Sequence, residues 1–179
     1  MKNIYLIMGA SGSGKTTIAK KLKELYGYTS VLSYTTRQPR ADGEEGHVFI
    51  TKSEFDKLTD VVAYTEYDGN FYASTAEQIN NNDLYIIDPD GVHNFNNSYH
   101  GAKNAVVIYI KTSLTTRMKR LENRDGFDAA LKRIETDIIA FRNAELLADK
   151  VVYNDDLSVE EAARLVGQYI QDCESQTVQ

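Results

Sequence analysis

Short apolar runs alternate with amphipathic segments along this chain. Four runs have the length and apolar character of buried parallel strands: residues 4–8, 85–88, 105–110 and 151–153. Four further segments have the spacing of helices: residues 15–25, 114–122, 128–147 and 158–171. This order predicts an α/β fold of three layers, in which helices cover both faces of a parallel central sheet.

Local signals support individual helices. In the first helical segment, Ile18, Leu22 and Leu25 fall on one face, which we expect to be buried. Ser158 and Glu161 have the spacing of a capping box at the start of the last helix.

Residues 33–82 interrupt the alternation of strands and helices. This stretch is rich in Tyr, Thr, Gly and charged residues, and it contains short strand-like pieces such as residues 47–50 and 70–74. We interpret it as a lobe inserted into a single domain that spans residues 1–179, whose core is formed by residues 1–32 and 83–179.

A phosphate-binding loop follows the first predicted strand. It fits the pattern G-x-x-x-x-G-K-[ST] with Gly9, Ala10, Ser11, Gly12, Ser13, Gly14, Lys15 and Thr16. Glycines let backbone N–H groups curl around a polyphosphate, and the N-terminus of the following helix adds positive potential. We expect Lys15 to reach the β- and γ-phosphates of ATP, Thr16 to ligate Mg²⁺, and Thr17 to lie in the same site.

Composition and charge limit the partners and the cellular compartment that we expect for this protein. The 179 residues carry a net charge of −6, which disfavours a nucleic-acid partner. No stretch approaches the ~20 apolar residues of a membrane span. The single cysteine and the absence of a signal-like N-terminus predict a reducing, cytoplasmic setting. The sequence leaves monomer and homodimer open.

Among proteins with such a loop, a small kinase fits best. A GTPase switch would need the guanine-reading tetrapeptide N-K-x-D, which this sequence lacks. A kinase must hold a second phosphorylated substrate and exclude water. Arg37 and Arg40 lie in the polar segment T-T-R-Q-P-R, and arginine is the bidentate ligand of phosphate.

Several motifs together resemble guanylate kinase over residues 3–169. They are the T-T-R-x-P-R segment, G-N-F-Y with the Ser-Thr pair that follows it, Asp88 and Asp90 at the end of the strand predicted over 85–88, R-L-E-N-R at 120–124, and N-D-D-L at 154–157. The resemblance implies an ATP-dependent nucleoside monophosphate kinase, most simply one that converts GMP or dGMP to the diphosphate, with Mg²⁺ and nucleotides as its small-molecule partners.

The resemblance also implies roles for individual residues. The acceptor nucleotide would be held in the lobe 33–82 and beside it, by Ser33, Arg37, Arg40, His47, Tyr72, Ser74, Asp88 and Asp90. Arg120 and Asn154 would lie near the adenine of ATP. Arg124 and Arg133 would close on the transferring phosphates from a lid at residues 120–135, beside the catalytic Lys15 and Arg37.

The helical spacing of the lid arginines is compatible with that view. Arg117, Arg120 and Arg124 fall on one helical face, and Asp125-Gly126 forms a hinge-like break. For Arg117 alone, we favour a solvated surface position.

Two positions depart from the family pattern. The glutamate that reads guanine falls on Ala63, so Glu44, Glu45 or Glu66 would have to supply a carboxylate. Glu66 is three residues farther along a strand, which places it on the opposite face. A shortened segment places His47 where the family has a phosphate-binding tyrosine; an imidazole can also donate to phosphate.

The sequence is also compatible with two rival functions. Glu45-Gly46-His47 resembles a segment of ribose 1,5-bisphosphate phosphokinase, which acts on an acceptor without a base. A guanylate-kinase-like domain can also be a non-catalytic binding module, although such modules tend to have a degraded phosphate loop.

Overall fold

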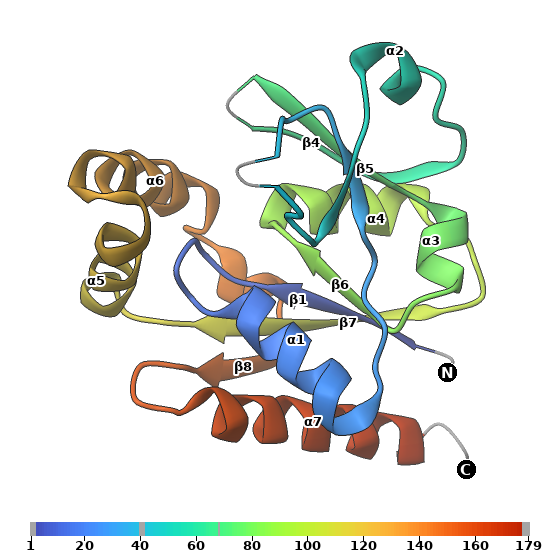
Figure 1. The fold of residues 1–179 in the computed structure, drawn as a ribbon. Coiled ribbons are helices and arrows are strands. Elements are labelled where there is room, and N and C mark those ends of the chain that lie inside the picture. The colour runs from blue at the N-terminus through green and yellow to red at the C-terminus, as the bar shows by residue number, and fades with distance from the viewer. Residues whose placement is uncertain (1–2, 40–41, 68, 177–179) are drawn as a thin grey trace.

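The computed structural model describes residues 3–39, 42–67 and 69–176. A central sheet of four parallel strands has the order β6-β1-β7-β8. Its strands are β1 (Asn3–Met8), β6 (Leu84–Ile87), β7 (Asn104–Lys111) and β8 (Lys150–Tyr153). The three-layer α/β/α architecture with a parallel sheet is therefore confirmed (Figure 1).

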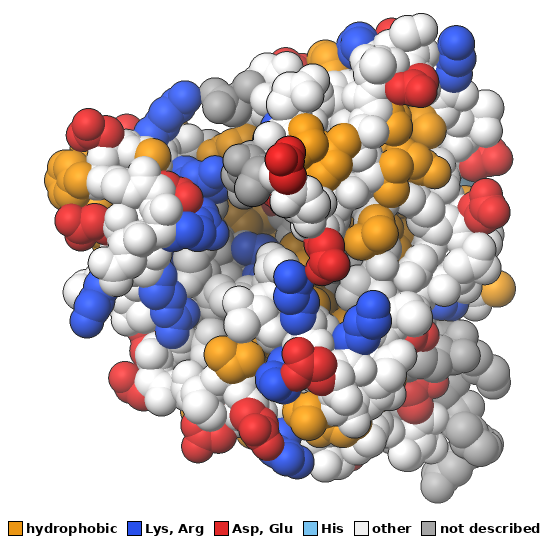
Figure 2. All heavy atoms as spheres, in the orientation of Figure 1, with side chains coloured by type: hydrophobic (Ala, Val, Ile, Leu, Met, Phe, Trp, Pro, Cys, Tyr) orange, Lys and Arg blue, Asp and Glu red, His pale blue; other side chains and the backbone are white. Residues whose placement is uncertain are grey.

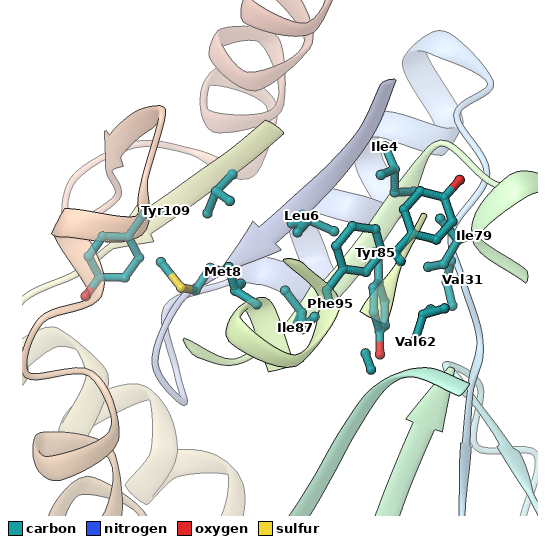
Figure 3. Packing of buried hydrophobic residues seen from close by; sticks show 14 of the residues in the cluster. Ile4, Leu6, Met8, Val31, Val62, Ile79, Tyr85, Ile87, Phe95 and Tyr109 are labelled. Atoms are coloured by element: carbon teal, nitrogen blue, oxygen red, sulfur yellow. The ribbon is translucent and has the colours of Figure 1, made fainter. Parts of the chain in front are cut away.

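The two faces of β1 enter two separate cores. Tyr5 and Ile7 pack with the helices α1 (Lys15–Tyr26) and α7 (Val159–Gln176). Ile4, Leu6 and Met8 face the opposite side and pack with α4 (Pro89–Ser98) and the 3₁₀ turn η1 (Ala144–Leu147). Figure 3 shows this second cluster. All six residues of β1 are buried, as expected for a strand covered on both faces.

A second sheet forms from the inserted segment, with strand order β3-β2-β5-β4. Its strands are β2 (Ser33–Thr35), β3 (His47–Phe49), β4 (Val61–Tyr67) and β5 (Asn70–Thr75), accompanied by the short helices α2 (Lys52–Phe55) and α3 (Ala76–Asn80). Val62 and Ala63 of β4 join the core beside α4. This contact fixes the second sheet against the carboxyl end of β6.

A helical hairpin projects from the other side of the molecule (Figure 1). It consists of α5 (Leu114–Asp125) and α6 (Phe127–Ala140), separated at Gly126 with φ +83°. Leu121, Ala130 and Ile134 form a small core between the two helices. The hairpin thus has its own apolar contacts, distinct from those of the central sheet.

Two details of the sequence prediction were wrong. The helix predicted over 128–147 ends at Ala140, and a separate 3₁₀ turn follows. Leu25 is 37% exposed, and the buried face of α1 consists of Ile18, Ala19 and Leu22. By contrast, Ser158 and Glu161 form the predicted reciprocal capping bonds at α7.

Candidate active site

The phosphate loop joins β1 to α1 and depends on glycine at two close approaches. A Cβ atom on Gly9 would lie 2.7 Å from the carbonyl oxygen of Ile110. Gly14 has φ +97°, and a Cβ there would meet the Asn154 amide at 2.8 Å. Because both positions exclude a side chain, the backbone can keep the tight curve that exposes N–H groups to an anion.

Three side chains hold the loop from behind. The Asn154 side-chain amide donates to the carbonyl of Ser13 at 2.8 Å and is buried. Arg120 donates to the carbonyls of Gly12 at 3.3 Å and Asn154 at 3.1 Å. Thr112 donates to Ser13 at 3.4 Å. Both Arg120 and Asn154 thus contact the loop itself, where they fix its shape.

Lys15 is the first residue of α1, and its burial at the phosphate loop disfavours the charged form of its ammonium group. Its ammonium donates to the carbonyl of Ala10 at 3.1 Å. Burial lowers the pKa of Lys15 to about 8, and the nearby Asp137 carboxylate opposes that shift. A polyphosphate would supply the missing negative charge. Thr16 and Thr17 follow in the first turn of α1 and are exposed.

A buried ion pair lies directly against the loop. Arg117 of α5 and Asp137 of α6 are 3.1 Å apart, and they are only 7% and 6% exposed. Asp137 also accepts a hydrogen bond from the Ser11 backbone N–H at 2.6 Å. The prediction of a solvated Arg117 is therefore wrong, because its partner comes from the neighbouring helix. The spacing of Arg117 with Arg120 hinted at a shared face, but no local sequence signal indicates Asp137.

A cavity of about 390 Å³ connects the phosphate loop with the second sheet. Figure 2 shows the surface hollowed between the α5–α6 hairpin and the second sheet, with Lys and Arg side chains beside the hollow. The predicted site residues that line the cavity are Gly9, Ser11, Lys15, Ser33, His47, Tyr72, Asp88, Asp90 and Arg133. One space is thus bounded by residues predicted for both substrates.

On the second sheet, the register of parallel strands β2 and β3 places Ser33 opposite His47. The Ser33 hydroxyl and His47 Nδ1 are 2.9 Å apart, and the His47 and Tyr72 rings meet edge to face at 5.7 Å. Ser74 is fully buried and does not line the cavity. It pairs across the sheet with Ala63, which is also buried.

Arg37, one of the two arginines predicted to bind the acceptor phosphate, does not line this cavity. Arg37 is held by Glu44 through two bonds of 2.8 and 3.1 Å and lies over the Phe49 ring. It lines a separate groove of about 680 Å³. An acceptor phosphate would therefore have to compete with the Glu44 carboxylate. Arg40 lies outside the described residues.

The structure also separates the three candidate base-reading glutamates. Glu66 borders the cavity but lies on the face of β4 that carries Tyr64, opposite Ala63, as the strand pattern predicted. Glu44 is paired with Arg37, and Glu45 is a largely exposed side chain 3.6 Å from Lys20. Of these three glutamates, Glu66 is the one that borders the cavity.

Asp88 joins three elements at the floor of the cavity. It is the N-cap of α4, accepting from the Gly91 N–H at 2.6 Å, and it accepts from the Thr65 hydroxyl at 3.2 Å. Burial raises the pKa of Asp88, and these two hydrogen bonds oppose the shift. Thr65 was missed in the sequence, where nothing distinguishes it from other strand threonines.

Two arginines of the hairpin, Arg124 and Arg133, lie beside Asp125. Arg124 bonds this carboxylate at 3.0 and 2.7 Å, and Arg133 lies 3.5 Å from it. Arg133 also lines the cavity, whereas Arg124 does not and is half exposed. Across the part of the chain that the structure describes, no group of three metal-ligating side chains occurs.

The comparison with known families agrees with this geometry. The guanylate kinase family model matches residues 1–173. The chain belongs to the guanylate kinase family. A guanylate kinase of Geobacter metallireducens is 30% identical, over 91% of this chain and 87% of the relative. A guanylate kinase of Neisseria gonorrhoeae is 33% identical, over 87% and 81%.

A solved guanylate kinase structure shares the fold of this family member. The enzyme of Anaplasma phagocytophilum superposes with a TM-score of 0.66 at 25% identity, covering 96% of this chain and 86% of that one. Within the described ranges, no helix of this chain is both long and apolar enough to cross a bilayer.

Proposed function

We propose that this guanylate kinase family member transfers the γ-phosphoryl group of ATP to a nucleoside monophosphate, with GMP or dGMP as the first-choice acceptor. One observation carries the proposal. The phosphate loop and the polar group Ser33, His47 and Tyr72 line the same cavity, so a donor and an acceptor can meet without crossing solvent.

The chain's own residues would act mainly by positioning and charge. Lys15 would contact the donor phosphates, and Arg133 would approach the transferring group from the α5–α6 hairpin. The acceptor oxygen is already anionic at neutral pH, so the reaction needs no dedicated nucleophile. The oxygen donors Thr16, Asp88 and Asp90 suit Mg²⁺, which keeps few protein ligands and binds mostly phosphate and water. Thr16 would hold that ion, which would neutralise phosphate charge.

In this proposal, residues 33–82 are the acceptor-binding lobe and residues 120–135 are a lid. His47 and Tyr72 would bind the acceptor phosphate, supported by the contact of His47 with Ser33. Arg37 would join them once phosphate replaces Glu44 on its guanidinium. The small core between α5 and α6 supports movement of the lid as a unit.

The base would be read differently from the family pattern. Ala63 stands where the family has its guanine-reading glutamate, and it has no carboxylate. It pairs across the sheet with Ser74, and both residues are buried. Glu66 borders the cavity from the other face of β4, and its side chain would have to turn toward the base to accept from the N–H groups of a guanine edge. We expect Glu66→Gln to raise the KM for GMP by about tenfold, since an unmatched polar edge costs roughly 1–3 kcal/mol. Glu45→Gln is the matched control and should leave that KM unchanged.

The direct test is ADP release from ATP–Mg²⁺ with GMP, dGMP, AMP, CMP, UMP and dTMP in turn. Selective turnover with GMP or dGMP is the expected result. Turnover with another monophosphate would keep the kinase and reassign the base pocket. Silence with all six, together with ATP binding measured by calorimetry, would refute a nucleotide acceptor. Lys15→Ala should abolish turnover while thermal unfolding still shows a folded chain; near-normal turnover would refute the role of the phosphate loop.

A further inference from the structure

One carboxylate oxygen of Asp137 accepts hydrogen bonds from two groups at the predicted ATP site. Its Oδ2 atom accepts from the Ser11 backbone N–H at 2.6 Å and from the Arg117 guanidinium at 3.1 Å. Its Oδ1 atom lies 3.4 Å from the Ser11 hydroxyl. A backbone N–H of a phosphate loop together with an arginine forms an ordinary seat for an anionic oxygen. In this structure, a carboxylate of the chain itself takes that seat.

The donors would be available to a phosphate if Asp137 left. Asp137 and Ser11 both line the cavity, so a ligand can reach the seat from the open space. Lys15 does not hold Asp137 by a hydrogen bond, since its ammonium donates to the Ala10 carbonyl. The hairpin contributes both members of the pair: Arg117 comes from α5 and Asp137 from α6.

We propose that Asp137 is an internal competitor of the donor phosphates, and that Arg117 becomes a phosphate ligand when ATP displaces it. The inference rests on the proposed function, in that it takes ATP as the ligand of the phosphate loop. A triphosphate carries more negative charge than one carboxylate and can satisfy the Ser11 N–H and Arg117 together. Arg117 remains paired throughout the exchange, so no buried charge is left without a partner.

The exchange couples ATP binding to the position of α6. While Asp137 holds Ser11, the hairpin is tied to the loop and the seat is closed to phosphate. If Asp137 is displaced in about one molecule in ten, the apparent Kd for ATP is about ten times the intrinsic Kd. Removing the Asp137 charge should therefore lower the apparent Kd by about tenfold.

The test measures the Kd of a non-hydrolysable ATP analogue by calorimetry. We expect Asp137→Asn to bind about tenfold more tightly than the native chain. Adding Arg117→Met to that variant should lose about tenfold again, because the phosphate ligand is gone. Glu135→Gln, an exposed acid on the same helix, is the matched control and should leave the Kd unchanged.

A second measurement covers the case in which Asp137→Asn does not fold. The chain contains no tryptophan, and Ile139 on α6 is 80% exposed, so Ile139→Trp gives a single reporter on the moving helix. We expect its fluorescence to change and saturate with the analogue at the calorimetric Kd.

Each remaining outcome decides against the proposal. Native-like or weaker affinity in a folded Asp137→Asn variant, or a reporter that stays silent at saturation, would mean that the pair is a fixed strut; the phosphate loop would keep its assignment. Absence of analogue binding by the native chain would instead overturn the proposed function, and this inference with it.

Discussion

The lowered pKa of Lys15 makes ATP affinity depend on pH in a defined direction. Burial brings that pKa from 10.5 to about 8, and the interval corresponds to about 3 kcal/mol that disfavours the charged form. Bound phosphates favour the charged form and raise the pKa again. Affinity should therefore be greatest below about pH 8. Above that pH the complex holds more protons than the unliganded chain, so Kd should rise by up to about tenfold per pH unit.

Calorimetry in two buffers of different ionisation enthalpy measures the proton that accompanies binding. At about pH 8.5, roughly one quarter of Lys15 is charged in the unliganded chain, so binding should take up about 0.8 of a proton. At about pH 6.5 in the same analysis, uptake by Lys15 should be close to zero. The reasoning would be refuted if the native chain took up as many protons as Lys15→Met at each of the two pH values.

The same residue should oppose stability when no ligand is present. Between about pH 8 and 10.5 the unfolded chain binds more protons at Lys15 than the folded chain, so this group makes stability rise with pH over that interval. Below about pH 8 its cost is fully present. Lys15→Met should thus stabilise the nucleotide-free chain at neutral pH by up to about 3 kcal/mol in urea unfolding. A variant less stable than the native chain would contradict the assigned cost of burial.

Three further substitutions test parts of the fold and the loop. Asn154→Ala removes the buried bond to Ser13 and should lower the free energy of unfolding by about 1–3 kcal/mol while weakening ATP binding in calorimetry. Gly167→Ala would place a Cβ 2.4 Å from the Tyr26 ring and should cost about 1–3 kcal/mol in urea unfolding with turnover unchanged. Ser158→Ala should cost about 1 kcal/mol in thermal unfolding by loss of the α7 cap, again without a change in turnover.

The sequence was most informative where structure depends on neighbours along the chain. Every end of the four core strands was predicted within one residue, because uninterrupted apolar runs record burial on both faces. The phosphate loop was equally readable, since its glycines, lysine and flanking elements are contiguous. By contrast, α4 was missed. Its sequence is mostly polar, and only Val92 and Phe95 among its larger side chains are buried; its start depends on the Asp88 cap.

Long-range pairings account for the remaining differences. Arg117 and Asp137 are twenty positions apart on different helices, and Arg37 and Glu44 are seven positions apart. Neither pairing leaves a periodic pattern, so charge alone predicted solvent exposure for one arginine and an open phosphate ligand for the other. By contrast, strict alternation correctly placed Glu66 on the face of Tyr64, opposite Ala63, because that pattern depends only on neighbours along the strand.

Asp88 constrains how this pocket can change over evolution. One carboxylate starts α4, holds Thr65 of the second sheet and borders the cavity. A substitution there would alter folding, lobe placement and ligand contact together, so selection has no means of tuning one without the others. We therefore expect changes in acceptor preference to arise at neighbouring residues with a single role, such as Glu66, and we expect Asp88 to be retained.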